Sequence, residues 1–192
     1  MSVNFYNNNA KTFFDSTKDV DMSHLWKRFL AYLPQNAHIL DAGCGSGRDS
    51  KHFIQQGITV TAFDASAALV EMAEELIGQP VHLDTFQTFQ SATKFDGIWA
   101  CASLLHVPAA DLPSVFTRLA NMLKPGSVFY CSFKYGNEDI EKVGRNFTNC
   151  DEFRLKKLIE NTGLATKDLW VSEDARPGRQ NEKWLNGILV KG

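Results

Sequence analysis

The residues from His38 to Ser50, HILDAGCGSGRDS, combine a short apolar run with three closely spaced glycines and an acid, Asp41, two residues before the first of them. Glycine permits positive φ and lets the backbone approach a ligand closely. A helix that begins directly after such a turn presents free N–H groups, which favour anionic ligand groups. The stretch therefore predicts a strand, a ligand-binding turn and a helix.

The spacing of these glycines separates two kinds of ligand. In the dinucleotide fingerprint G-x-G-x-x-G the third glycine follows the second by three residues. Here the pattern is G-x-G-x-G, and Arg48 stands where that glycine is wanted. A carboxylate at Asp41 repels a pyrophosphate but suits a ligand that carries an ammonium group. An NAD-dependent oxidoreductase is thus the alternative enzyme, and a ligand with an amino-acid end fits better.

A second acid follows the next expected strand. The β-branched run Ile58–Phe63 leads directly into Asp64, 23 residues after Asp41. Rossmann-like folds place an acid on the ribose hydroxyls at an interval of about 20 residues. Ser66 is already available to cap the expected helix Ala67–Ile77, so Asp64 is not needed there. We expect Asp64 to bind a ribose that has no 2′-phosphate.

The heptapeptide DAGCGSG resembles the first motif, (D/E)-x-G-x-G-x-G, of the class I S-adenosylmethionine-dependent methyltransferases, and the L-K-P-G turn at 123–126 is also similar. The resemblance implies S-adenosyl-L-methionine as cofactor. Its methionine end would lie near Asp41, with Arg48 reaching the carboxylate and Asp84 the adenine. The cofactor-binding residues predicted on this basis are Asp41, Gly43, Gly45, Arg48, Asp64, Ala65, Asp84, Thr85 and Phe86.

The acceptor side is expected after the fourth strand, Phe95–Cys101, in a loop that contains His106. A neutral imidazole with an ordinary pKa of about 6.5 can take a proton from an acceptor. The alternative is a histidine that only fixes the loop or lines the pocket. Further substrate candidates, each of which has a solvated surface side chain as its alternative, are Tyr6, Lys134, Arg145, Arg176, Arg179 and Trp184.

The composition is that of an ordinary soluble domain. The chain has 192 residues, 44% of them hydrophobic and 22% charged, and a net charge of −2. This charge gives no global basic field for nucleic acid or an anionic membrane. The four cysteines form no C-x-x-C pair, so no metal site is expected, and no signal sequence or membrane span is evident. We expect a cytoplasmic monomer or homodimer.

The sequence predicts one domain over 1–192, with a helical cap at 1–35 that includes the amphipathic run Met22–Leu33. Alternating strands and helices follow, then strands at Leu164–Val171 and Trp184–Val190. We predict an α/β fold, a Rossmann-like doubly wound sheet of seven mostly parallel strands with an antiparallel C-terminal hairpin and helices on both faces. The polar segment Glu173–Lys183 is too long for a hairpin turn, so it is either disordered or a substrate lip.

The leading functional prediction is a methyltransferase that acts on a small-molecule acceptor by in-line displacement. GCGSGRDS followed by FDAS also resembles the small bacterial tellurite and thiol methyltransferases. No basic, aromatic-interleaved track for nucleic acid is present. Besides the oxidoreductase, a regulatory protein that binds the cofactor without catalysis is the remaining alternative.

Overall fold

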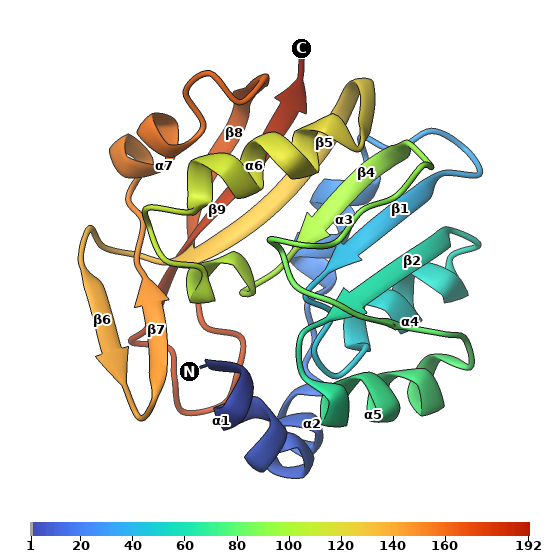
Figure 1. Ribbon diagram of the computed structural model, residues 1–192, viewed down its shortest axis with the longest axis vertical. Helices are drawn as coiled ribbons and strands as arrows, with labels where there is room; N and C mark the ends of the chain where they lie inside the picture. Colours follow the sequence, from blue (N-terminus) through green and yellow to red (C-terminus); the bar gives the residue numbers. More distant parts are fainter. Residues whose placement is uncertain (1) are drawn as a thin grey trace.

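A single seven-stranded sheet runs through the protein in the order β3-β2-β1-β4-β5-β9-β8 (Figure 1). The computed structural model describes residues 2–192. Strands β1 to β5 are parallel, and β9 pairs antiparallel with both β5 and β8. The predicted fold class is confirmed. The strands are β1 (His38–Ala42), β2 (Thr59–Asp64), β3 (His82–Leu83), β4 (Phe95–Ala100), β5 (Leu123–Lys134), β8 (Leu164–Glu173) and β9 (Lys183–Lys191).

Helices cover both faces of this sheet, because successive strand residues point to opposite sides. Ile39 packs in one apolar cluster with residues of α3, α4 and α5, and Leu40 packs in the other with residues of α6 and α7. Both side chains are fully buried. The helices are α3 (Ser23–Leu30), α4 (Arg48–Gln55), α5 (Ala67–Ile77), α6 (Leu112–Asn121) and α7 (Glu152–Leu158).

Two parts of the fold are more elaborate than the sequence-based expectation. The N-terminal segment holds two helices before α3, namely α1 (Ser2–Asn8) and α2 (Ala10–Thr17). The segment after β5 forms a two-stranded antiparallel sheet of β6 (Asp139–Lys142) and β7 (Arg145–Thr148), which we did not predict. Figure 1 shows α1 lying between β7 and α5, and it contacts both.

Strand β5 begins at Leu123, the first residue of the L-K-P-G turn recognised in the sequence. Phe95 pairs with Leu123, but Gly97 pairs with Val128, so the register shifts where the Lys-Pro-Gly turn is accommodated. Gly126 in this turn has φ of 77°. The turn was thus recognised correctly, and the strand extends through it.

Gly97 in β4 sets how closely α3 packs on the sheet. An added Cβ would lie 2.8 Å from Leu33 Cδ2 and 2.8 Å from Cζ of the fully buried Phe29 ring. Atoms this close overlap, so one of the two elements would have to move.

We therefore expect Gly97→Ala to lower the free energy of unfolding by about 1 kcal/mol or more in urea titrations. Adding Phe29→Leu, which removes Cζ, should cost less in the Gly97→Ala background than in the wild type. Equal costs in both backgrounds would show that the predicted overlap does not exist.

Candidate functional site

A cavity of about 610 Å³ lies at the carboxyl ends of β1, β2 and β4. Its wall combines the loop after β1, the ends of β2 and β3, the loop after β4, the cap helix α1 and strand β7. Ligands of open α/β sheets bind at this edge. Of the predicted site residues, those that line the cavity are Tyr6, Gly43, Gly45, Arg48, Asp64, Ala65, Asp84, Thr85, Phe86, His106, Lys134, Arg145, Arg176, Arg179 and Trp184.

The glycine loop is tied to the end of β2 by three backbone N–H groups. Those of Gly43 and Cys44 donate to the Phe63 carbonyl oxygen at 2.9 and 3.0 Å, and that of Gly45 donates to Asp64 Oδ2 at 2.9 Å. Gly43 has φ of 76°, and a Cβ on it would lie 2.7 Å from Ser103 Cβ. Only glycine fits this position, since a side chain would be both strained and in collision.

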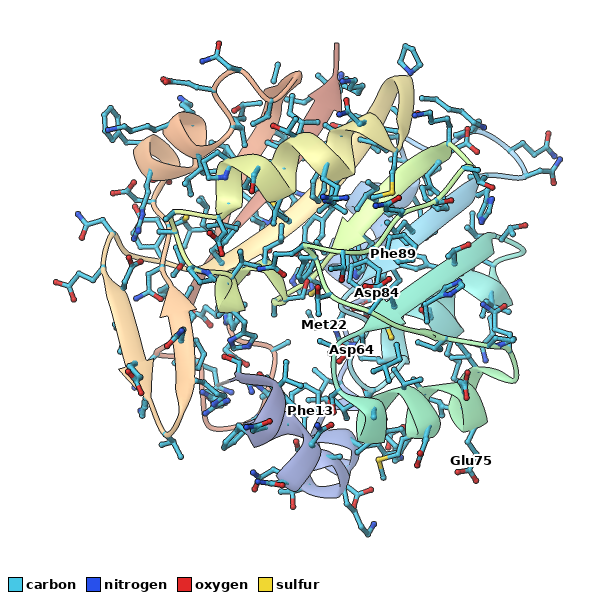
Figure 2. All side chains as sticks on the ribbon, viewed as in Figure 1. Phe13, Met22, Asp64, Glu75, Asp84 and Phe89 are labelled. Carbon is cyan, nitrogen blue, oxygen red and sulfur yellow. The ribbon has the colours of Figure 1, made fainter. Side chains whose placement is uncertain are left out.

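Asp64 and Asp84 lie side by side where β2 and β3 end (Figure 2). The backbone N–H of Asp84 donates to the Asp64 carbonyl oxygen at 3.0 Å. Asp64 Oδ1 accepts the Ser66 N–H at 2.9 Å. Burial raises the pKa of Asp64, and the N–H donors of Ser66, Gly45 and Ala65 oppose that rise. A carboxylate oxygen accepts more than one hydrogen bond, so both acids can still bind a ligand from the cavity.

Asp41 lies behind the glycine loop and is not among the residues that line the cavity. Its side chain is 2% exposed, and its Oδ2 accepts a hydrogen bond from Ser50 Oγ of α4 at 2.6 Å. Asp41 is therefore the one predicted cofactor-binding residue that does not line the cavity. Strand alternation turns its side chain under the first turn of α4. Burial, and then the neighbouring Asp49 charge, raises the pKa of Asp41.

Asp49 is a cavity residue that the sequence analysis missed. Its two oxygens accept hydrogen bonds from Arg48 Nε at 2.7 Å and Nη2 at 2.8 Å. They also accept the indole N–H groups of Trp26 at 2.9 Å and Trp99 at 2.8 Å. Burial alone would raise the pKa of Asp49, but the Arg48 charge and these hydrogen bonds outweigh it and lower the pKa. The predicted cofactor residue Arg48 is thus held in place by a buried anion.

Because Asn at this position keeps the shape but loses the charge, we expect Asp49→Asn to leave the buried Arg48 cation uncompensated. The free energy of unfolding at pH 7 should fall by about 2 kcal/mol or more in urea titrations. Asp15→Asn is the control, since Asp15 pairs with Lys11 on the surface with side chains 52% and 80% exposed. The control should change stability by less than about 0.5 kcal/mol. Similar small losses in both variants would contradict this assignment.

His106 is held between two partners at the end of the 3-10 helix η1 (Leu104–His106). Its Nδ1 lies 2.9 Å from the Asn146 carbonyl oxygen, and its Nε2 lies 2.7 Å from the Tyr6 hydroxyl of α1. A carbonyl only accepts, so Nδ1 carries the proton and Nε2 accepts from Tyr6. Burial lowers the pKa of His106 to about 4. At neutral pH the ring is therefore neutral, with a proton-accepting nitrogen on the cavity wall.

In the folded protein the pKa of His106 lies below its ordinary value of 6.5. As the pH falls, the imidazole of the unfolded chain therefore binds a proton before that of the folded chain does. The contribution of His106 to stability is expected to be complete above about pH 6.5 and to be lost as the pH falls towards 4. Nitrogen-15 NMR of the imidazole should show the Nδ1–H form from pH 5 to 8 and a midpoint near 4. A midpoint near 6.5 would contradict the buried position.

The cations of the 173–183 segment are paired within it. Arg176 Nε donates to Asp174 Oδ1 at 2.8 Å, and the Trp184 indole N–H donates to Asp174 Oδ2 at 3.1 Å. Glu182 pairs with Arg179 at 2.6 Å and with Lys134. The backbone N–H of Asp174 also donates to the Glu182 carbonyl oxygen at 2.9 Å. The segment thus folds back on itself, and residues 173–176 together with Arg179 line the cavity.

Within residues 2–192, no group of three or more His, Cys, Asp or Glu side chains is placed to hold a metal ion. In the same part of the chain, every helix is too short or too polar to cross a membrane.

Comparison with known proteins identifies the class. The family model described as a methyltransferase domain matches residues 14–165. The putative methyltransferase YqeM of Bacillus subtilis is 29% identical over 170 residues, 74% of this chain and 68% of that protein. The ubiquinone biosynthesis O-methyltransferase of Pasteurella multocida is 31% identical over 146 residues, 64% of this chain and 60% of that protein.

Solved structures show the same fold. The chain superposes with a TM-score of 0.79 and 22% identity on a Burkholderia thailandensis 1,6-didemethyltoxoflavin-N1-methyltransferase, over 99% of this chain and 85% of that one. A TehB-like S-adenosylmethionine-dependent methyltransferase of Corynebacterium glutamicum gives 0.71 and 20%, over 100% and 96%. The architecture is that of the S-adenosylmethionine-dependent methyltransferases. Since the family model covers most of its length, the chain belongs to the methyltransferase-domain family.

Proposed function

We propose that this methyltransferase binds S-adenosyl-L-methionine in the cavity and directs its methyl group to a small-molecule acceptor by in-line displacement. The observation that supports this best is that two sets of residues line one cavity. The first is the glycine loop with Asp64 and Asp84, and the second is Tyr6 with His106. A cofactor bound to the first set would have its reactive centre within the same cavity as the second.

The chain's residues fit the parts of this cofactor. The carboxylate of Asp64 would accept hydrogen bonds from the two ribose hydroxyls, and Asp84, Thr85 and Phe86 would bind the adenine. Phe86 packs edge-to-face on Phe63 at 5.2 Å between ring centroids, so its ring is already fixed. Arg48 would bind the carboxylate of the amino-acid end, with Asp49 holding its guanidinium. Asp41 would act from behind the loop, through α4, rather than by contact.

Methyl transfer from this cofactor depends mainly on positioning the acceptor and needs few catalytic residues. The cofactor supplies an activated methyl group with its own leaving group. The protein has to align the acceptor with that methyl and exclude water, and such alignment is worth up to about 7–11 kcal/mol. Helix α1 covers the cavity, held by Ser66 Oγ to Asn7 Oδ1 at 2.7 Å and by Asn146 N to Ser2 Oγ at 3.2 Å.

His106 is the candidate base for an acceptor that arrives protonated. Its Nε2 now accepts the Tyr6 hydroxyl, which marks where an acceptor O–H or N–H would bind. With a low pKa it is a weak base, so it suits an acceptor whose own proton is acidic. The relatives support acceptors of small size: the Pasteurella protein is an O-methyltransferase of ubiquinone biosynthesis, and the Burkholderia protein methylates N1 of 1,6-didemethyltoxoflavin.

Calorimetric titration with S-adenosylhomocysteine tests the cofactor assignment. Asp64→Ala should weaken its binding by about 1 kcal/mol or more, roughly fivefold, because a charge-assisted hydrogen bond to the ribose is lost. Glu75→Ala is the control, since Glu75 points away from the cavity on the outer side of α5 (Figure 2) and should bind normally. Unchanged affinity in Asp64→Ala would remove Asp64 from the site.

The same titration separates the alternatives. Wild-type protein that binds NAD and not S-adenosylhomocysteine would favour the oxidoreductase. Binding of S-adenosylhomocysteine without methyl transfer from labelled cofactor to any thiol, oxyanion or amine acceptor would favour the regulatory protein.

A further inference from the structure

Arg145, the first residue of β7, is a cation on the cavity wall with an incomplete environment. Its guanidinium carbon lies 4.1 Å from the centre of the Phe5 ring of α1 and 5.0 Å from that of Phe147. Its Nε is buried, and no hydrogen-bond partner for this atom lies in the part of the chain that the structure describes. The two rings therefore cover the guanidinium while part of its hydrogen-bonding capacity is left unused.

Most of the neighbouring cations differ from Arg145 in this respect. Lys134 and Arg179 share Glu182, and Arg176 pairs with Asp174. Lys142 also lines the cavity without an ion pair among the described residues, but its side chain is exposed to solvent. Among the arginines that line the cavity, Arg145 alone has no carboxylate within 4.0 Å in residues 2–192.

Burying part of the Arg145 guanidinium without a hydrogen-bond acceptor costs free energy, and a bound anion would remove that cost. Contact with aromatic faces stabilises a guanidinium only weakly, and the buried Nε–H of Arg145 still lacks an acceptor within residues 2–192. The N–H groups of a guanidinium form a planar fork that matches a carboxylate, with two parallel hydrogen bonds. A ligand oxyanion in the plane of the fork would satisfy both the charge and the geometry.

The position of Arg145 places such an anion beside the reacting group. The adjacent residue, Asn146, supplies the carbonyl oxygen that orients His106. Tyr6, Phe147 and Trp184 add flat apolar surface to the same part of the wall. Glu173 and Asp174 also line the cavity, which favours a single negative charge over a phosphate.

We infer that the methyl acceptor is a small planar monoanion, with a carboxylate or similar oxyanion bound by Arg145 and the atom to be methylated next to His106. This rests on the proposed function, since it names the class of acceptor for the same cavity.

Matched pairs of probes test the inference. Protein saturated with S-adenosylhomocysteine would be titrated with benzoate and benzamide, with nicotinate and nicotinamide, and with phenyl phosphate. At least one acid should bind about tenfold or more tighter than its amide, the scale of a charge-assisted bidentate contact, and tighter than phenyl phosphate. Equal affinities, or no saturable binding of either acid, would overturn the proposal. Tighter binding of phenyl phosphate would contradict the inference that the acceptor carries a single negative charge.

Substitutions of Arg145 test whether this residue causes the preference for the acid. Arg145→Met should abolish the preference for the acid, and Arg145→Lys, which keeps the charge but loses the fork, should retain only part of it. Lys156→Met is the control, because Lys156 is exposed on α7 and does not line the cavity. An equal loss in Lys156→Met would show a general charge effect and contradict a specific site. Failure of the wild type to bind S-adenosylhomocysteine would instead refute the proposed function.

Discussion

Three backbone N–H groups of the glycine loop, those of Gly43, Cys44 and Gly45, bond to the end of β2. The rest of the site depends on this interaction, because it makes the loop after β1 and the acid after β2 one unit. The parallel pairing of Ala42 with Phe63 brings the two strand ends together. Positive φ at the glycines then turns the amides towards β2, so the loop cannot move without disturbing Asp64.

A second constraint joins this unit to the sheet's other layers. The buried carboxylate of Asp49 holds Arg48 in the cavity. It also accepts hydrogen bonds from the indole N–H groups of Trp26 in α3 and Trp99 in β4. A buried anion is stable only when its oxygens are fully bonded, so the three elements must pack together before Arg48 is placed. The ligand-binding edge and the core behind it thus stabilise one another.

The features that were predicted correctly come from short patterns in the sequence. The three-glycine turn, the acid after β2 and the Ser66 cap are each specified within a few residues, and the structure has them as expected. Asp49 was missed because its partners lie 23 residues before it and 50 after it. Asp41 has the right motif position but faces α4. Arg176 has a carboxylate partner and Arg145 has none in residues 2–192, and this difference depends on how two loops fold. The spacing of residues in the sequence does not predict it.

We propose that one cavity holds the cofactor at the glycine loop and Asp64 and turns its reactive centre towards Tyr6 and His106. The decisive experiment is a crystal structure of the protein with S-adenosylhomocysteine. We expect the ribose hydroxyls on the Asp64 carboxylate and the sulfur facing the part of the cavity lined by Tyr6, His106 and Arg145. A ligand bound outside this cavity, or one whose sulfur faces away from those residues, would contradict it.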